Sequence, residues 1–401
     1  MDYASAIQWL YAKLPMYQRV GKAALNPNLD GITELIRHFG YPDQKFKSIH
    51  IAGTNGKGSS AHMLASILQE AGYKVGLYTS PHLKDFSERI RINGVSIEQD
   101  YILDFVVSHR TYLEQQDFSF FEMTVGLAFD YFANKQVDVA VIEVGLGGRL
   151  DATNIIKPEA CLITNIAIDH QQFLGTTKSA IAKEKGGIIK RNTPVVLGAD
   201  DKEIFAVFEA IAKPLNAPLY VAEEHTYVTD LLGDYQQQNI NGVVSLLKKL
   251  SSFTVSDNHI NNGLQQVCKN TGIRGRWEII GNKPTVIADV AHNKSGLKVV
   301  LNQLTSLEYN NLHIIFGMAN DKDVENLMTL LPKDAIYYLC AAAVPRALKV
   351  SILSFYFGNH NYIFTSHESV KHAYDAALNC AKSDDVIFIG GSLFVVSEIL
   401  P

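Results

Sequence analysis

The chain has 401 residues, which is too many for one typical hydrophobic core and predicts two domains. Its content of 47% hydrophobic and 19% charged residues is ordinary for a soluble globular protein, and no apolar stretch is long enough to span a bilayer. A net charge of -5 without a basic patch argues against nucleic acid, and scattered cysteines and the lack of a secretory signal predict a cytoplasmic protein without a zinc knuckle.

Short apolar runs alternate with amphipathic segments after a helical start over about residues 1–41. The candidate strands are Lys47–Ile51, Val75–Tyr78, Val137–Val144, Ala160–Asn165 and Pro194–Leu197. Amphipathic helices are expected at Tyr101–Glu114 and Phe121–Asn134. Several strands are apolar at nearly every position, as parallel strands covered on both faces are. The alternation predicts a doubly wound, mostly parallel α/β sheet of the P-loop type, which binds ligands beyond the carboxyl ends of its strands.

A glycine-rich turn carrying one lysine follows the first strand. Its residues are Gly53-Thr54-Asn55-Gly56-Lys57-Gly58-Ser59, and a helix with apolar side chains at helical spacing follows them. Glycines let the backbone wrap phosphate oxygens, while the helix N-terminus and Lys57 supply positive charge. Because Gly58 follows Lys57, the turn departs from the pattern G-x-x-x-x-G-K-[ST]. The turn predicts a nucleotide triphosphate site; the alternative is an ordinary strand-to-helix connection.

Polar side chains stand at or near the ends of the next strands. Ser80 follows the second strand and could donate its hydroxyl to a metal or phosphate, although a simple turn explains it equally well. Glu143 lies in a nearly all-apolar strand, where a carboxylate is costly unless it is ion-paired or binds a metal such as Mg²⁺. Asp169 and His170 follow a further strand; the imidazole could ligate a metal while Asp169 orients water or backbone.

The second half of the chain predicts another domain. Gly281-Asn282-Lys283-Pro284 looks like a linker, so we place one domain over residues 1–280 and a second over 281–401. Within the first of these domains, Ile181–Ile188 ends a helix and, by composition alone, is a solvated run of charged residues with a glycine cap. Beyond the linker, a smaller, Rossmann-like α/β domain is expected, with strands at Thr285–Ala288, Leu312–Phe316, Ala335–Leu339, Tyr362–Thr365 and Val386–Ile389.

Polar groups also gather at strand ends in this second domain. Asp289 could take ribose hydroxyls or guide an arginine, and Arg276 lies shortly before the linker. His292 and Asn293 could line a cleft. Further polar strand ends lie at Gly317–Asp323 and Gly390–Ser392. Such polar ends on both domains are typical of a two-substrate site that closes.

Taken together, these motifs resemble the folylpolyglutamate synthase and dihydrofolate synthase family, relatives of the Mur ligases. The resemblance covers most of the chain, from Gly53–Ser59 to Gly390–Ser392. It implies an ATP-dependent ligase that joins L-glutamate to dihydropteroate, to a reduced folate, or to both. The compact chain fits the bacterial members that do both, so we expect a bifunctional enzyme, and we expect a monomer. In that reaction the folate carboxylate takes the γ-phosphoryl group to form an acyl phosphate, which the amine of glutamate then attacks. The first domain would bind ATP and the pterin, and the second would serve glutamate ligation.

The resemblance also implies roles for single residues. The phosphates would be cradled by Thr54 to Ser59, and ATP would be held further by Asn239, Arg276 and Asp289. One or two Mg²⁺ ions would be bound by Ser80, Glu143, His170 and Lys185. Lys185 stands where the family often carries a carbamylated lysine, a change that converts a cation into an anion. The pterin would be approached by Leu25, Asn26, Pro27, Ser119, Leu150, Asp151 and Ala152. The catalytic set would be Lys57, His170, Lys185 and His292, the last near the incoming glutamate.

Two other functions stay open on the residues alone. A Mur-type cell-wall ligase would share the catalytic core, but such enzymes carry a nucleotide-sugar domain before the phosphate loop, and only about fifty residues precede Gly53 here. A nucleotide-binding switch of the GTPase kind would need an Asn-Lys-x-Asp base reader. The segment Asn293-Lys294-Ser295-Gly296 lacks that aspartate, so the ligase is the expected function.

Overall fold

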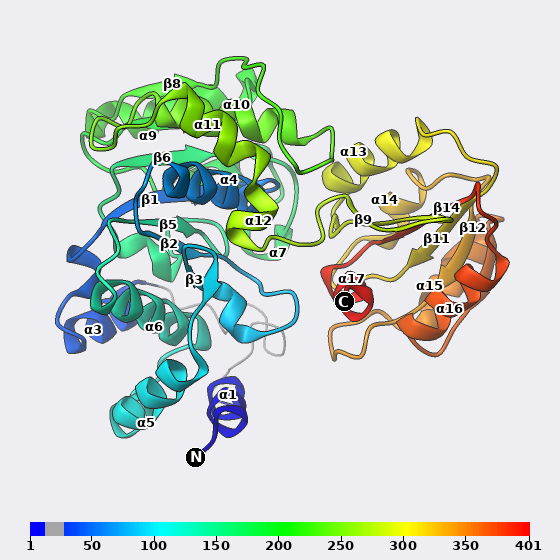
Figure 1. The fold of residues 1–401 in the computed structure, drawn as a ribbon, viewed down its shortest axis with the longest axis horizontal. Coiled ribbons are helices and arrows are strands. Elements are labelled where there is room, and N and C mark those ends of the chain that lie inside the picture. Colours follow the sequence, from blue (N-terminus) through cyan, green and yellow to red (C-terminus); the bar gives the residue numbers. More distant parts are fainter. Residues whose placement is uncertain (13–27) are drawn as a thin grey trace. The chain divides into compact units, whose positions relative to one another are not determined.

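The computed structural model describes residues 1–12 and 28–401, which divide into two compact units (Figure 1). Unit 1 comprises Met1–Asp230 and Gln236–Gly272, and unit 2 comprises Leu231–Tyr235 and Ile273–Pro401. The chain therefore leaves unit 1 after Asp230, returns at Gln236 and leaves again after Gly272. The functional boundary expected at residue 280 stays a prediction. The last boundary between the two compact units lies after Gly272.

Unit 1 is built on an eight-stranded sheet with the order β4-β3-β2-β5-β1-β6-β7-β8. The strands are β1 (Lys47–Ala52), β2 (Val75–Tyr78), β3 (Ile90–Ile92), β4 (Val95–Ser96), β5 (Val139–Glu143), β6 (Ala160–Ile163), β7 (Val195–Leu197) and β8 (Leu219–Val221). From β2 to β8 all neighbours in this order are parallel, and the antiparallel pairs are β2 with β3 and β3 with β4. The expected doubly wound, mostly parallel sheet is confirmed.

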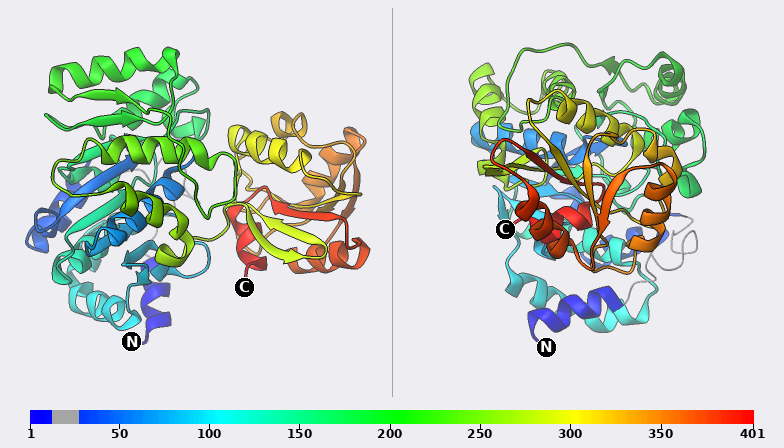
Figure 2. Two further views of the ribbon diagram at one scale, coloured as in Figure 1. Left: turned by 45° about the horizontal axis from the view of Figure 1, so that its top comes forward. Right: turned by 90° about the vertical axis from the view of Figure 1, so that its right-hand side faces the viewer.

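Helices flank this sheet on both faces (Figure 2). The described helices of unit 1 are α1 (Tyr3–Ala12), α3 (Asp30–His38), α4 (Lys57–Glu70), α5 (Gln99–Gln115), α6 (Phe120–Asn134), α7 (Gln171–Leu174), α8 (Lys178–Gly186), α9 (Lys202–Ala212), α10 (Gln236–Leu247), α11 (Asp257–Gln265) and α12 (Val267–Thr271). Short 3₁₀ turns are η2 (Pro42–Gln44), η3 (Phe86–Arg89), η4 (Ala152–Ile155) and η5 (Lys213–Leu215). Helix α4 is buried from Ser59 to Leu68 because it packs against strands β1, β2 and β5 and helices α10 to α12.

The strands of unit 1 present opposite faces to different helices. Ala140 and Ile142 of β5 share a hydrophobic core with residues of α3, α5 and α6. Because side chains alternate along a strand, the residues between them point to the other face, where α4 packs. Among the described residues, no helix combines the length and apolarity needed to cross a membrane.

Unit 2 has a six-stranded sheet with the order β13-β12-β11-β14-β10-β9. Its strands are β9 (Glu278–Asn282), β10 (Thr285–Ala288), β11 (Leu312–Phe316), β12 (Ile336–Leu339), β13 (Ile363–Ser366) and β14 (Val386–Gly390). Its helices are α13 (Lys294–Thr305), α14 (Val324–Met328), α15 (Val350–Asn359), α16 (Val370–Cys380) and α17 (Leu393–Ile399). All strand pairs are parallel except β9 with β10, so the smaller α/β domain is also confirmed.

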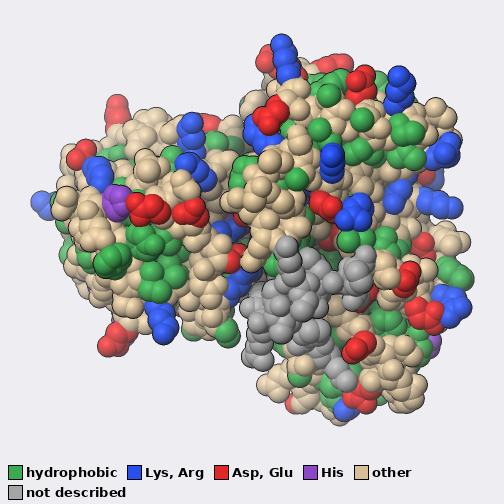
Figure 3. All heavy atoms as spheres, turned by 180° about the vertical axis from the view of Figure 1, so that it is seen from behind, with side chains coloured by type: hydrophobic (Ala, Val, Ile, Leu, Met, Phe, Trp, Pro, Cys, Tyr) green, Lys and Arg blue, Asp and Glu red, His purple; other side chains and the backbone are tan. Residues whose placement is uncertain are grey.

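The linker expected at residues 281–284 is wrong. Strand β9 pairs antiparallel with β10, and Lys283-Pro284 form the turn between them. Hairpin turns and linkers share a composition of glycine, proline and polar residues, so the sequence pattern does not separate them. On the face that Figure 3 shows, acidic and basic side chains are interspersed over each unit, in keeping with the small net charge.

Candidate functional site

The phosphate loop, Gly53–Ser59, joins the end of β1 to the start of α4. Gly53 and Gly56 have φ angles of 148° and 81°, a region that side-chain-bearing residues rarely adopt. A Cβ atom on Gly53 would lie 1.8 Å from Thr164 Oγ1, and one on Gly56 would lie 2.2 Å from Asn239 Oδ1. Glycine is therefore required at both positions, and the loop closely approaches neighbouring polar side chains.

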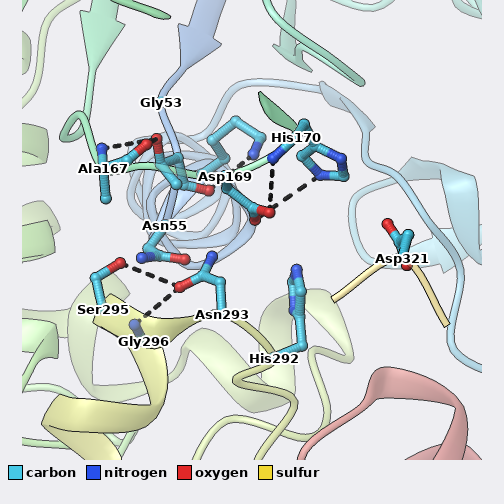
Figure 4. Close-up of polar contacts among 12 residues, drawn as sticks. Gly53, Asn55, Ala167, Asp169, His170, His292, Asn293, Ser295, Gly296 and Asp321 are labelled. Carbon is cyan, nitrogen blue, oxygen red and sulfur yellow. Dashed lines mark hydrogen bonds and ion pairs between the residues drawn. The ribbon is translucent and has the colours of Figure 1, made fainter. Parts of the chain in front are cut away.

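Side chains of the loop are tied to the segment that follows β6. The Thr54 hydroxyl donates to Ala167 O at 3.2 Å and accepts from Ala167 N at 3.0 Å. The same segment carries Asp169 and His170 two and three residues later, and Figure 4 shows Gly53, Ala167, Asp169 and His170 close together. The phosphate loop and the candidate metal-binding residues thus lie on adjoining segments of unit 1.

Two lysines lie against the carbonyl groups of the loop. Lys57 Nζ donates to Thr54 O at 3.2 Å, and Lys185 Nζ donates to Gly53 O at 2.7 Å. Lys185 is only 4% exposed, so the interpretation of its helix as a solvated charge run is wrong for this residue, although Lys183 is exposed. Burial and then the nearby Lys57 charge lower the pKa of Lys185 to about 7. A large fraction of Lys185 is therefore an uncharged amine near neutral pH.

Glu143 lies at the carboxyl end of β5, beside Ile51 of β1 in the sheet register. Its carboxylate is buried, and Oε2 accepts a hydrogen bond from Ser80 N at 3.2 Å. The structure therefore brings the predicted pair Ser80 and Glu143 together at the carboxyl end of β5, next to the end of β1 from which the phosphate loop continues.

His170 and Asp169 form a second polar group at that edge of the sheet. Asp169 Oδ1 accepts from His170 N at 2.8 Å, and its Oδ2 lies 3.8 Å from His170 Nε2 (Figure 4). Within the described residues, no cluster of three or more His, Cys, Asp or Glu side chains is arranged to hold a metal ion. Magnesium in proteins usually keeps several waters and is bound through one or two carboxylates together with phosphate oxygens.

The residues expected near the pterin have different surroundings. Asp151 is buried: Oδ2 accepts from Leu146 N at 2.8 Å, and Oδ1 accepts from the amide and hydroxyl of Thr153 at 3.0 and 2.6 Å. Burial raises the pKa of this carboxyl group. Its described contacts therefore hold the loop that also contains Leu150 and the buried Ala152. Leu25, Asn26 and Pro27 lie outside the described residues.

Ser119 is the N-cap of α6. Its hydroxyl accepts from Glu122 N at 3.2 Å and donates to Glu122 Oε2 at 2.7 Å, while Glu122 Oε2 also accepts from Ser119 N. This reciprocal arrangement is a capping box, which gives Ser119 a structural role in addition to the predicted contact with substrate.

Asn239, predicted to contact ATP, lies on α10 beside the phosphate loop. Its Nδ2 donates to Gln236 Oε1 at 2.8 Å, and Gln236 Nε2 in turn donates to Ser59 Oγ at 3.4 Å. The side chain of Asn239 fills the space in which a Cβ on Gly56 would lie. The structure therefore brings this residue, distant in sequence, to the loop, as the prediction requires.

Asp289 of unit 2 is buried and has internal hydrogen bonds. Its Oδ2 accepts from Tyr235 Oη at 2.6 Å and from Trp277 N at 2.8 Å, and its Oδ1 accepts from Ala291 N at 2.8 Å. Burial raises the pKa of the carboxyl group, and the adjacent Arg276 charge partly opposes that change. Both readings of Asp289, binding of ribose hydroxyls and guidance of Arg276, stay predictions.

The other expected residues of unit 2 follow β10. His292 Nδ1 lies 3.1 Å from Val290 O. Asn293 is the N-cap of α13: its Oδ1 accepts from Gly296 N at 2.9 Å and from Ser295 Oγ at 3.1 Å (Figure 4). These contacts fix the turn that carries His292. Asn293 acts as a helix cap, which is a position that asparagine often occupies.

Sequence reasoning assigned no role to Thr164, Asn165 or Tyr235, which the structure places in contact with predicted site residues. The signal for the first two was a polar pair directly after the all-apolar strand β6. Tyr235 gave no such signal, because its partner Asp289 is 54 positions away in the sequence.

Two family models match the chain. The Mur ligase middle domain matches residues 51–265, more than half of the chain, and the Mur ligase glutamate ligase domain matches residues 275–393. Among relatives, the probable bifunctional folylpolyglutamate synthase/dihydropteroate synthase of Haloferax volcanii is 33% identical over 99% of this chain and 50% of its own length. The chain thus spans about half the length of this relative. The folylpolyglutamate synthase of Lacticaseibacillus casei is 32% identical over 100% of this chain and 98% of the relative.

Solved structures agree with these matches. E. coli FolC in complex with DHPP and ADP superimposes with a TM-score of 0.88 and 27% identity, over 100% of this chain and 98% of that one. The bifunctional folylpolyglutamate synthase/dihydrofolate synthase of Yersinia pestis, complexed with AMPPNP and Mn ion, gives a TM-score of 0.86 and 26% identity over 100% and 97%. The chain therefore belongs to the folylpolyglutamate synthase and dihydrofolate synthase family of the Mur ligases.

Proposed function

We propose that this protein is an ATP-dependent ligase that joins L-glutamate to dihydropteroate and to reduced folates, acting in the cytoplasm as both dihydrofolate synthase and folylpolyglutamate synthase. The observation that carries the proposal is the phosphate loop with Lys57, beside which the buried Glu143 and Lys185 lie at one edge of a parallel sheet. Support comes from the Bacillus subtilis and Escherichia coli relatives, which are named dihydrofolate synthase/folylpolyglutamate synthase, and from family structures that contain ADP with DHPP, or AMPPNP with Mn.

The reaction has two chemical steps, phosphoryl transfer and amide formation. A folate carboxylate oxygen displaces ADP from the γ-phosphorus of ATP, which turns a poor electrophile into an acyl phosphate. The amine of glutamate, after losing a proton, then attacks the activated carbon, and inorganic phosphate leaves. Thr54 to Ser59 bind the phosphates, and Lys57 offsets charge on the transferred group. These residues act by orienting the two substrates and by neutralising charge.

The residues that would hold a divalent ion are Ser80, Glu143, His170 and Lys185. A buried carboxylate next to a phosphate loop, which accepts a hydrogen bond from the Ser80 amide, fits the oxygen-rich coordination that Mg²⁺ prefers. When bound, the ion would neutralise phosphate charge and polarise the phosphoryl oxygens.

The proposal includes carbamylation of Lys185. A neutral amine adds CO₂ to give a carbamate and a released proton, and Lys185 meets the first requirement because its pKa is lowered to about 7. Nuclear magnetic resonance of the protein in ¹³C-labelled bicarbonate tests this step: a carbamate signal should appear in wild type and in Lys183→Gln, and should be absent from Lys185→Gln.

Roles for the other expected residues remain part of the proposal. Asn239, Arg276 and Asp289 would serve ATP, and His292 would lie near glutamate. The pterin would be approached by Ser119, Leu150, Asp151 and Ala152.

An ADP-release assay tests the function. Release should require glutamate and should respond both to dihydropteroate and to tetrahydrofolate as acceptors. Lys57→Ala should lower turnover by about two orders of magnitude or more, since it removes the charge at the phosphates, whereas the exposed Lys45→Ala should match wild type. If a cell-wall precursor stimulated ADP release and neither pterin acceptor did, the folate assignment would be wrong.

A further inference from the structure

We propose that Asn165 is a positioning residue that sets the affinity for ATP by fixing the orientation of one peptide group in the phosphate loop. The inference rests on the proposed binding of ATP by this loop and concerns a residue to which the predictions assigned no role. Asn165 follows β6 and is half-buried, so its side chain reaches the loop from the neighbouring segment of unit 1.

The side chain of Asn165 pairs with both polar groups of the Asn55 backbone. Its Oδ1 accepts from Asn55 N at 3.0 Å, and its Nδ2 donates to Asn55 O at 3.1 Å. Only a side chain with an acceptor and a donor on one carbon makes this two-bond arrangement. The Thr164 hydroxyl adds a further bond to Asn55 O at 2.6 Å, so two donors from one segment hold this carbonyl.

The fixed carbonyl determines where the next amide points. The C=O of Asn55 and the N–H of Gly56 belong to one planar trans peptide and point in opposite directions. Gly56 has a φ of 81°, and glycine tolerates either sign of φ, so little in the loop itself prevents this peptide from turning over. With Asn55 O held by Thr164 and Asn165, the Gly56 N–H must face away from that segment.

That orientation matters because a phosphate site needs amides, not carbonyls, directed at the anion. The first N–H groups of a helix have no carbonyl one turn before them, so those at the start of α4 suit the same anion. A reversed Asn55–Gly56 peptide would place a carbonyl oxygen among them and repel phosphate. Asn165 and Thr164 therefore preorganise the loop for the nucleotide.

Calorimetric titration with ADP in the presence of Mg²⁺ tests the proposal. Asn165→Leu removes both hydrogen bonds at nearly the same size, and we expect the dissociation constant to rise about tenfold to a hundredfold. Asn165→Asp keeps the acceptor but puts an oxygen opposite Asn55 O, and should weaken binding at least as much. Thr164→Val should have a smaller effect in the same direction. The exposed Asn262→Leu is the matched control and should leave binding unchanged.

Steady-state kinetics separates positioning from a general structural role. The KM for ATP should rise in the Asn165 variants, while the KM values for glutamate and the folate acceptor and the melting temperature stay near those of wild type. Wild-type affinity for ADP in Asn165→Asp or Asn165→Leu would overturn the inference, and so would an equal rise in all three KM values. If the wild-type protein bound no ADP, the proposed function itself would fail first, and the two failures are thus distinguishable.

Discussion

His50 lies in the middle of β1 and is fully buried. Its Nε2 is 2.9 Å from Thr153 Oγ1, and that hydroxyl donates to Asp151 Oδ1. Because the hydroxyl proton is already committed to the carboxylate, His50 must be the donor and is therefore the neutral tautomer protonated on Nε2. Burial lowers the pKa of His50 to about 3, which keeps the ring neutral at physiological pH.

This histidine makes the fold sensitive to acid. An unfolded histidine titrates near pH 6.5, so between about pH 6.5 and 3 the unfolded chain binds a proton that the folded chain does not. Stability is therefore complete above that window and falls as the pH drops through it. Urea unfolding at pH 7, 5.5 and 4.5 should show this loss, and His50→Gln should reduce its slope. The exposed His372→Gln is the control, and an unchanged slope in His50→Gln would contradict the prediction.

Lys185 is expected to lower the stability of the fold while serving its function. Its pKa is lowered to about 7 in the folded chain, against about 10.4 when unfolded, so the unfolded chain binds more protons between these values. The cost of burying the amine is therefore greatest below pH 7 and fades as the pH rises towards 10. Lys185→Met should be more stable than wild type at pH 6, by about 1–3 kcal/mol, and should lose ligase activity.

Urea unfolding at pH 6 and pH 9, combined with the ADP-release assay, checks this prediction. The exposed Lys183→Met should change neither quantity. A stability difference that is equal at both pH values would show that burial of the charge is not its cause.

Helix caps decide where several functional segments begin. Ser119 starts α6 through its capping box, and Ser256 starts α11 through a similar one with His259. Ser119→Ala and Ser256→Ala should each lower the free energy of unfolding by about 1 kcal/mol, because each leaves an amide at the helix start without its acceptor.

The same pair of variants tests the predicted role of Ser119 at the pterin. If Ser119 also contacts the substrate, Ser119→Ala should raise the KM for the folate acceptor, and Ser256→Ala should not. Equal KM values in both variants, together with the loss of stability, would limit Ser119 to its role as a cap.

The sequence predicts the buried elements of this fold well. β2, β10 and β11 occupy the expected residues because a parallel strand covered on both faces must be apolar throughout. The strands that were not expected, β3, β4, β8 and β9, are short or partly exposed, and the residues of β8 and β9 are mostly half-buried. Half-buried strands at the edge of a sheet leave too weak a pattern in so few residues.

Within the candidate site, the local motifs were visible but their tertiary contacts were not. The spacing of glycines around Lys57 predicts the loop, because the backbone geometry there depends on adjacent residues. The burial of Lys185 and the pairing of Asn165 with Asn55 depend on segments more than a hundred residues apart, and no local pattern encodes them.

At the scale of the whole molecule, each unit has its own hydrophobic core, and unit 2 also has a buried carboxylate that joins two of its segments. That carboxylate belongs to Asp385. Its Oδ1 accepts from both nitrogen donors of Asn311, at 2.9 and 3.0 Å, and its Oδ2 accepts from Lys382 N at 2.7 Å and lies 3.3 Å from His313 Nε2. The carboxylate thus ties the turn before β14 to the start of β11.

Compact units with separate cores commonly unfold in separate steps, so calorimetry should resolve more than one transition. Asp385→Ala leaves several buried donors without an acceptor and should destabilise unit 2 by about 2–4 kcal/mol. Only one transition should move to lower temperature, and the exposed neighbour Asp384→Ala should move none. An equal shift of all transitions would show that the two units unfold as one.

The path of the chain also has a consequence for anyone who wishes to divide this protein. If the protein were divided between residues 272 and 273, Leu231–Tyr235 would stay on the N-terminal fragment. Those five residues pack with unit 2, and the Tyr235 hydroxyl donates a hydrogen bond to Asp289 of that unit. The C-terminal fragment would then carry a buried carboxylate deprived of one donor. Split-protein reporters and domain swaps should therefore transplant this short excursion together with residues 273–401.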